Sequence, residues 1–303
     1  MPILIIAFNR PELLKNLLKS LKTYKPKKIY FACDGPRIGN KLDYEKCKKI
    51  KEIVETELSW ECQVFKKIQN ENIGVKLNIN SALDWFFEEE KMGIIIEDDC
   101  DPSESFFYFC EELLTKYKDE EKVKIISGNY YHGNIIEKDS YYFSKCPGTH
   151  GWATWRRVWK ENEKNMDSWN GKLEIFWLTK YLKYDFVKAH YFYKKFSDSF
   201  KGVIKSWDYQ LLYSVWRKNG LIIRPYKSLC KHIGWGDDAT HSKRPDQHPD
   251  VVIKNINFPM EHPKTFKVND KLDNIEIKQT RNLYFWKYIF YKIKKKLFNK
   301  HHH

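Results

Sequence analysis

The stretch Gly93–Pro102, GIIIEDDCDP, decides the fold, because an apolar run stops there directly against a cluster of acids. Four acids, Glu97, Asp98, Asp99 and Asp101, lie within five residues. The continuous apolar run predicts a strand buried on both faces, as in a parallel sheet. Since ligands of open α/β sheets bind at the carboxyl ends of strands, we expect the acids at the functional edge of the sheet.

Strand-like and helix-like segments alternate on both sides of this stretch. Apolar runs predict further strands at residues 3–8, 28–33, 62–67 and 123–128. Amphipathic patterns predict a helix beginning at Pro11 and others at 43–58, in the later part of 70–90, and at 103–117. This alternation predicts an α/β fold: a Rossmann-like, mixed and mainly parallel sheet flanked by helices.

The pattern changes after about residue 140, where helices dominate. The segment 146–159 is expected to be a loop that enters an aromatic-rich helix. The remaining predictions are helices at 173–184, 185–197 and 206–220, a strand at 221–225, a polar loop at 232–250, and irregular chain to about 278. We therefore divide the chain into two halves of one domain, 1–140 and 141–245, followed by a C-terminal extension, 246–300.

Composition places the chain among soluble globular proteins. It has 303 residues, of which 42% are hydrophobic and 31% charged, so it is long enough to bury a large core. The net charge of +14 favours an anionic partner. Seven cysteines without metal-ligand spacing indicate reduced thiols, and the N-terminal segment lacks the features of a signal peptide. A cytoplasmic location is expected, and His301–His303 is interpreted as the stub of a purification tag.

The acids have two interpretations when they are considered alone. Adjacent carboxylates suit a hard divalent cation such as Mg²⁺ or Mn²⁺, which at this edge of a sheet would bind a diphosphate. Alternatively, they form a solvated turn before a helix, since Asp101, Ser103 and Glu104 are favourable residues at a helix N-terminus. The position directly after an isoleucine-rich strand favours the cation site.

Five segments, taken together and in order, resemble inverting, metal-dependent glycosyltransferases of the GT-A fold. The resemblance is closest to the N-acetylglucosaminyltransferases that carry Glu-Asp-Asp as the metal motif. The matching segments are IIAFNRPELL (5–14), FACDG (31–35), NIGVKLNINSALDWFF (72–87), GIIIEDDCDPSESFFYF (93–109), and CPGTHGWATWRRVW (146–159) with SWDYQLL (206–212) and LIIRPYKSLCKHIGWG (221–236). The resemblance implies transfer of a sugar, such as N-acetylglucosamine, from a uridine-diphosphate donor to a glycan hydroxyl.

The resemblance also implies roles for individual residues. Asp99, with His232 as an additional ligand, would hold Mn²⁺ or Mg²⁺, and Asp208 would be the general base. Trp152 and Trp207 would stack on the acceptor. The residues implied in donor binding are Asn9, Arg10, Asp34, Asn72, Lys76, Glu97 and Asp98. Residues 1–140 would then bind the nucleotide sugar, and residues 141–245 would bind the acceptor and catalyse transfer.

Several of these residues also have a purely structural interpretation. Asp208 is a favourable acid for a first helical turn, and single tryptophans are more often part of a core. Asn72 suits a turn, Arg10 and Lys76 suit a solvated surface, and His232 begins a polar segment that also holds Asp237, Asp238 and His241.

The C-terminal segment 281–300 is expected to be a basic, aromatic amphipathic helix. Such a helix suits an anionic membrane surface. The expected acceptor is then a glycan or a lipid-linked glycan of a bacterial envelope, elongated at the inner face of the cytoplasmic membrane. The structural alternative is a helix that docks on the domain and keeps its lysines in water.

Two other functional classes are weighed against sugar transfer. A sugar-nucleotide nucleotidyltransferase usually has a glycine-rich, basic loop after the first strand, whereas residues 8–14, FNRPELL, contain no glycine. A non-catalytic nucleic-acid-binding protein would explain the positive charge, but no recognition motif or groove-binding helix is present in the sequence. We therefore expect no nucleic-acid partner.

Overall fold

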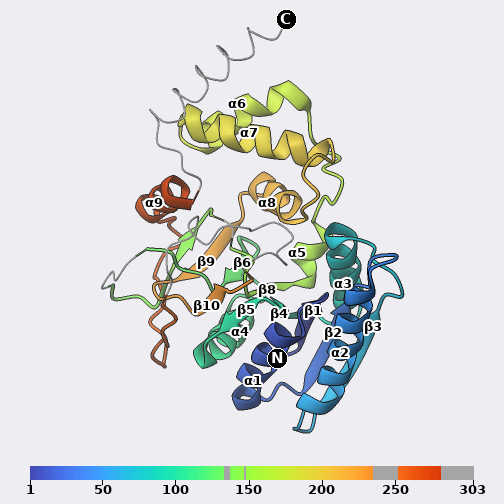
Figure 1. The fold of residues 1–303 in the computed structure, drawn as a ribbon. Coiled ribbons are helices and arrows are strands. Elements are labelled where there is room, and N and C mark those ends of the chain that lie inside the picture. Colours follow the sequence, from blue (N-terminus) through green and yellow to red (C-terminus); the bar gives the residue numbers. More distant parts are fainter. Residues whose placement is uncertain (133–136, 147, 235–251, 281–303) are drawn as a thin grey trace, which may run out of the picture.

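The centre of the structure is an eight-stranded mixed sheet with helices on both faces (Figure 1). A computed structural model describes residues 1–132, 137–146, 148–234 and 252–280. The strand order is β3-β2-β1-β4-β8-β6-β9-β7. The strands of this sheet are β1 (Ile3–Ala7), β2 (Lys28–Cys33), β3 (Gln63–Ile68), β4 (Met92–Glu97), β6 (Val123–Ser127), β7 (Tyr141–Ser144), β8 (Trp152–Trp155) and β9 (Leu221–Pro225).

Four neighbouring strands, β3, β2, β1 and β4, pair in parallel and form the N-terminal part of the sheet. Beyond β4 the sheet becomes mixed, because β8 pairs antiparallel with both β4 and β6. Strand β9 is parallel to β6, and β7 closes the far edge antiparallel to β9. The α/β fold class predicted from the alternation of segments is therefore confirmed, with a mostly parallel sheet.

Helices cover both faces of the sheet. They are α1 (Pro11–Tyr24), α2 (Lys41–Glu57), α3 (Val75–Glu89), α4 (Glu104–Lys116), α5 (Arg156–Lys160), α6 (Glu174–Tyr181), α7 (Phe186–Phe200), α8 (Asp208–Arg217) and α9 (Asp270–Thr280), with a 3-10 turn at Gly171–Leu173. Helix α1 begins at Pro11 as predicted, since proline suits the first turn of a helix. Figure 1 shows α6 and α7 stacked on the side of α8 that is away from the sheet.

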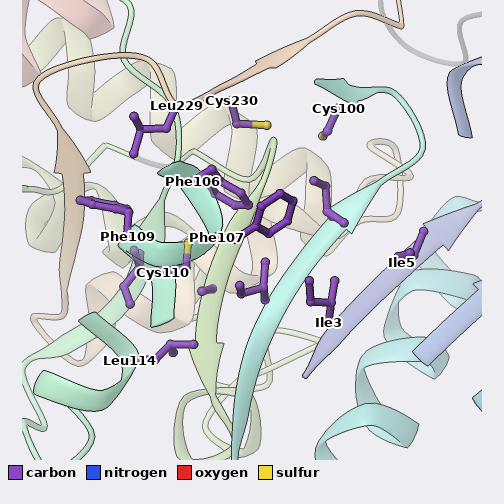
Figure 2. Packing of buried hydrophobic residues seen from close by; sticks show 14 of the residues in the cluster. Ile3, Ile5, Cys100, Phe106, Phe107, Phe109, Cys110, Leu114, Leu229 and Cys230 are labelled. Atoms are coloured by element: carbon purple, nitrogen blue, oxygen red, sulfur yellow. The ribbon is translucent and has the colours of Figure 1, made fainter. Parts of the chain in front are cut away.

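The two larger hydrophobic cores form because successive residues of a strand point to opposite faces. Ile3 and Ile5 of β1 join the core under α1, α2 and α4, whereas Leu4 and Ile6 join the core under α3, α7 and α8. Figure 2 shows the first core, in which aromatic side chains of α4, such as Phe106, pack over β1 and β4.

Several segments differ from the sequence-based predictions. Trp152–Trp155 is a buried central strand and not the start of a helix, because four residues are too short to reveal a period. Strand β7 was not predicted at all. Helix α9 lies within the segment expected to be irregular. It is fixed there by tertiary contacts: Asp273 accepts hydrogen bonds from Ser144 Oγ at 2.6 Å and from the Lys145 amide at 2.8 Å.

A small second sheet lies directly beyond the acids. Strand β5 (Cys100–Pro102) pairs antiparallel with β10 (Cys230–His232), so His232 lies opposite Cys100. The acids therefore lead into a strand, and helix α4 begins two residues later at Glu104. Ser103, at the N-cap position, makes no capping hydrogen bond with its side chain.

The predicted basic helix at 281–300, the tag stub at 301–303, and Asp237, Asp238 and His241 all lie outside the described residues. Within the described part of the chain, no helix is both long and apolar enough to cross a membrane.

Candidate functional site

The acids at the carboxyl end of β4 are tied to the turn that follows β1. Asp98 Oδ2 accepts a hydrogen bond from the Phe8 amide at 3.1 Å, and the Asp98 amide donates to the Ile6 carbonyl at 2.9 Å. Arg10 Nη1 lies 3.5 Å from Asp98 Oδ1 and donates a hydrogen bond to Asp99 Oδ2. The structure thus brings Arg10, predicted to bind the donor, together with Asp98 and Asp99.

Asp99 is held between the two halves of the chain. His232 Nε2 lies 3.1 Å from Asp99 Oδ2, and the Ile233 amide donates to the Asp99 carbonyl at 2.8 Å. The ring of His150 lies 4.6 Å from that of His232, centroid to centroid. Gly234 packs against Asp99 so closely that an added Cβ would lie 2.6 Å from Asp99 Oδ2.

The distance between Asp99 Oδ2 and His232 Nε2 suits two ligands of one divalent cation. Two ligands at about 2.1 Å from one octahedral ion, in adjacent positions, lie about 3 Å apart, and the 3.1 Å separation of Asp99 Oδ2 and His232 Nε2 fits this spacing. Among the residues that the structure describes, no group of three or more His, Cys, Asp or Glu side chains is arranged as a metal site. The chain would thus supply two ligands, and Arg10 would have to release Asp99 first.

Burial and crowding change the pKa values of the acids in opposite directions. Burial, together with the charges of Asp99, Asp98 and Asp208, raises the pKa of Glu97 well above its usual value. Burial and the neighbouring Asp99 raise the pKa of Asp98 to about 7, although Arg10 opposes the shift. Burial also disfavours ionisation of Asp99, but the His232 hydrogen bond and nearby positive charges outweigh it and lower the pKa of Asp99. The surroundings therefore favour ionisation of Asp99 and disfavour ionisation of Glu97 and Asp98.

Asp208 begins helix α8 and comes close enough to the acids for its charge to act on Glu97. Ser206 Oγ donates a hydrogen bond to Asp208 Oδ1, which leaves Oδ2 as the oxygen that could accept from a substrate hydroxyl. Trp207 occupies the N-cap position and makes no capping hydrogen bond with its side chain. The carboxylate of Asp208 is half-buried at the start of the helix.

Asn9, in the turn after β1, is hydrogen-bonded to Asp43 of α2, and Asp43 in turn binds Arg37 of the loop before α2. The sequence analysis missed both Arg37 and Asp43. Asn9 Nδ2 donates to Asp43 Oδ1 at 2.8 Å, and Arg37 Nη2 donates to the same oxygen at 2.9 Å. The Arg37 guanidinium lies 5.7 Å from the centre of the Phe8 ring. Asp43 is buried and follows the N-cap residue Asn40 by three positions, so the sequence marks it only as an acid in a first helical turn.

The side chains of Asp34 and Asn72 are hydrogen-bonded to each other. Asp34 Oδ1 accepts from the amides of Gly35 and Ile73, and Oδ2 accepts from the Gly74 amide and from Asn72 Nδ2, all between 2.9 and 3.1 Å. Four donors fill the acceptor positions of a carboxylate. In this structure Asp34 therefore fixes the start of α3. Both of its carboxylate oxygens are already used in hydrogen bonds within the protein, and its contact with a nucleotide stays a prediction.

The two tryptophans predicted to stack on an acceptor lie in the core. Trp152 is fully buried in β8, and Trp207 is 5% exposed. Their rings stack on each other with centroids 5.5 Å apart. Neither indole presents an open face to a ligand in this structure. The remaining predicted donor residue, Lys76, lies on the first turn of α3 and points to Gln210 of α8.

Comparisons with known proteins give a limited result. No protein-family model matches the chain, and no curated protein matches its sequence. Similar solved structures include HddC from Yersinia pseudotuberculosis, at 14% identity and a TM-score of 0.35 over 54% of this chain and 80% of that chain. Another is 4-diphosphocytidyl-2C-methyl-D-erythritol synthase from Anaerococcus prevotii, at 14% identity and a TM-score of 0.35 over 60% and 84%.

A UDP-glucose pyrophosphorylase complexed with UDP-glucose is also similar, at 11% identity and a TM-score of 0.31 over 53% of this chain and 78% of that chain. A further HddC structure is a complex with GMP-PN. At such identities and TM-scores the similarity supports no conclusion about the activity of this chain.

Proposed function

We propose that the protein is a metal-dependent, inverting glycosyltransferase that moves a sugar from a nucleotide diphosphate to a glycan hydroxyl. The main support is the position of Asp208, a half-buried carboxylate at the start of α8 that lies close enough to Glu97 for its charge to contribute to the raised pKa of Glu97. Transfer to a hydroxyl needs a carboxylate opposite the leaving group, because the attacking oxygen must lose its proton.

In the proposed reaction, Asp208 Oδ2 accepts the proton of the acceptor hydroxyl. The hydroxyl oxygen forms a bond to the anomeric carbon, and the bond from that carbon to the diphosphate breaks, so the electron pair leaves on the diphosphate. A divalent cation held by Asp99 and His232 would neutralise the charge of the leaving diphosphate. Arg10, once released from the acids, would add a guanidinium that suits phosphate oxygens.

Nucleotidyl transfer is the second candidate. Its nucleophile is a phosphate that is already anionic, so it has no need of a base such as Asp208. Arg10 favours this candidate, because it lies in the turn after β1 and places a cation beside the acids at the end of β4. The names of the similar structures also agree better with this second candidate, but their similarity is too low to carry weight.

Two product assays separate the candidates. With a panel of nucleotide sugars and a glycan acceptor, a glycosyltransferase releases a nucleoside diphosphate only when Mn²⁺ or Mg²⁺ is present. With nucleoside triphosphates and sugar 1-phosphates, a nucleotidyltransferase releases pyrophosphate. We expect the first product and not the second. Release of pyrophosphate alone would reverse the order of the two candidates.

Replacement of the base tests the mechanism. Asp208→Asn is expected to keep donor binding and to lose transfer by roughly a hundred- to ten-thousandfold, the usual contribution of a general base. Donor binding is measured by calorimetry and transfer by release of the nucleoside diphosphate. Full transfer activity in Asp208→Asn would remove this residue from the mechanism.

The membrane part of the prediction is tested separately, because its helix lies outside the described residues. Removal of residues 281–300 is expected to abolish sedimentation of the protein with vesicles that contain anionic lipids. Vesicles of neutral lipid are the control. Unchanged sedimentation of the shortened chain would contradict the proposed membrane surface.

A further inference from the structure

A buried amide connects the start of α3 with the turn that carries Asp208. Gln210 is 2% exposed and lies in the first turn of α8. With its amide oriented by its neighbours, the side-chain nitrogen donates to the carbonyl oxygens of Ser206 at 2.9 Å and Trp207 at 3.2 Å. Its oxygen accepts from Lys76 Nζ at 3.1 Å. One side chain thus joins residues from both halves of the chain.

The position of Gln210 within the helix explains what this amide does. It is the third residue of α8, where a glutamine commonly reaches back to the N-cap amide and so caps the helix. Here the side chain donates instead to the carbonyls of the two residues that precede the helix. Gln210 therefore fixes the backbone that enters α8, and this backbone carries both Ser206 and Asp208.

The backbone position of Ser206 in turn decides the direction of the base. Ser206 Oγ donates a hydrogen bond to Asp208 Oδ1, so a shift of residue 206 would rotate the carboxylate or break this bond. The opposite end of the network is also fixed. Asp34 accepts hydrogen bonds from the Ile73 and Gly74 amides and so holds the start of α3, two residues before Lys76.

We propose that Gln210 is a positioning residue for sugar transfer: its amide holds the Ser206–Trp207 backbone and the Lys76 ammonium in one network and so directs the Asp208 carboxylate toward the acceptor hydroxyl. This inference rests on the proposed function, in which Asp208 is the base. Gln210 is buried behind the turn and acts through Ser206 and Asp208.

The test uses Gln210→Met, which keeps the length of the side chain and removes all three hydrogen bonds. The expected result is a fall in kcat of roughly ten- to hundredfold, since small misplacements of a reacting group have effects of this size. The KM for the nucleotide sugar should change less than about threefold, because the buried Gln210 side chain acts through the Asp208 turn. A loss confined to KM would overturn the proposal.

A second variant separates the two ends of the network. Gln210→Glu keeps an acceptor for Lys76 but loses the donor to the Ser206 and Trp207 carbonyls. We expect it to be as impaired in kcat as Gln210→Met. If Gln210→Glu restored kcat, the contact with Lys76 alone would matter and the proposed control of the Asp208 turn would be wrong.

Ser214→Ala is the matched control. Ser214 lies one turn further along α8, is 4% exposed, and donates from Oγ to the Gln210 carbonyl at 2.9 Å. Its removal should lower the urea midpoint without changing kcat. Equal kcat values for Gln210→Met and Ser214→Ala would overturn the positioning role, because the loss would then reflect stability alone.

A further variant covers the case in which Gln210→Met does not fold. Lys76→Met removes the half-buried ammonium of the same network from the side of α3, and it should lower kcat several-fold. An unchanged kcat in this variant would overturn the proposed link between Lys76 and the base.

The outcome also distinguishes this proposal from the function on which it rests. A wild-type protein that transfers no sugar, or a fully active Asp208→Asn, would overturn both. An active wild type with an inactive Asp208→Asn and a normal kcat in Gln210→Met would overturn the positioning role alone.

Discussion

At the residue scale, the position of Asp99 depends on the absence of a side chain at Gly234. A Cβ on Gly234 would lie 2.6 Å from both Cβ and Oδ2 of Asp99, far inside van der Waals contact. Gly234→Ala is therefore expected to displace the carboxylate and to weaken metal-dependent donor binding at least tenfold. Calorimetric titration of the donor, with and without Mn²⁺, measures this effect.

Gly202→Ala is the control for that substitution. Gly202 has a φ of +70° with open space around its Cα, so alanine should cost about 1 kcal/mol of stability through backbone strain alone. Its donor binding should equal that of the wild type. Similar losses of binding in both variants would show that strain, and not contact with Asp99, is responsible.

Two aspartates of the acidic stretch, Asp99 and Asp101, differ in their surroundings. Asp99 contacts His232 and Arg10, whereas the more exposed Asp101 is paired with Lys231 at 3.8 Å. Asp99→Asn should abolish the Mn²⁺ dependence of donor binding, and Asp101→Asn should leave it unchanged. Equal effects of the two substitutions would mean that general negative charge, and not a specific ligand, attracts the cation.

The sequence indicated which kinds of residue lie at the site but not how each is used. The position of the acids after β4 was predicted, because the end of a buried strand is visible as an abrupt change from apolar to acidic residues. The role of Asp34 was not, since its four donors come from residues 35 and 72–74 and appear only once the loop has folded. The contact of Lys76 with Gln210, 134 positions away in the numbering, has no local sequence pattern either.

At the scale of single elements, α9 is held to the sheet by a buried ion pair. Arg224 Nη1 of β9 lies 2.7 Å from Glu276 Oε1, and both side chains are at most 5% exposed. Arg224→Met should destabilise the fold by about 3–5 kcal/mol, because it leaves a carboxylate buried without its main counter-charge. Urea unfolding followed by far-UV circular dichroism measures the change.

The double variant Arg224→Met with Glu276→Leu is the control for this prediction. Since both charges are then removed, most of the lost stability should return. A double variant as unstable as Arg224→Met would mean that the packing of the long side chains, and not their charges, holds α9.

Helices and strands could be predicted from the sequence where they are long enough for the repeat of apolar residues to be recognised. Helices α1 and α4 follow an apolar stripe over three turns or more, and strands β1, β2 and β4 of the parallel part are nearly continuous apolar runs. Strands β7 and β8 have four residues each, and β5 has three, which is too few to distinguish a strand from a loop. Helix α9 escaped prediction because contacts with β7 and β9 stabilise it.

At the scale of the whole molecule, the buried carboxylate of Asp43 makes the stability of the fold depend on pH. Hydrogen bonds from Arg37 and Asn9 outweigh burial and lower the pKa of Asp43 from 3.8 to about 2. The folded state therefore binds fewer protons than the unfolded state between these values, so this contribution to stability is complete above about pH 4 and is lost as the pH falls toward 2.

The size of this contribution is about 1–2 kcal/mol, because exposure of Arg37 to solvent weakens the pair. In urea unfolding, the difference in stability between wild type and Asp43→Asn should shrink when the pH falls from 6 to 3. A difference that stays constant over this range would contradict the assigned pKa.

The central position of β8 has a consequence for how the protein can be divided. Strand β6 pairs only with β8 and β9 among the described residues, and both of these strands follow residue 140. In a chain that ends at residue 140, one edge of β4 would be unpaired and β6 would have no neighbouring strand. Unpaired strand edges form hydrogen bonds with strands of other molecules and so promote aggregation. A fragment of residues 1–140 should therefore precipitate when expressed alone, and a shortened soluble fragment will have to retain residues 152–155 and 221–225.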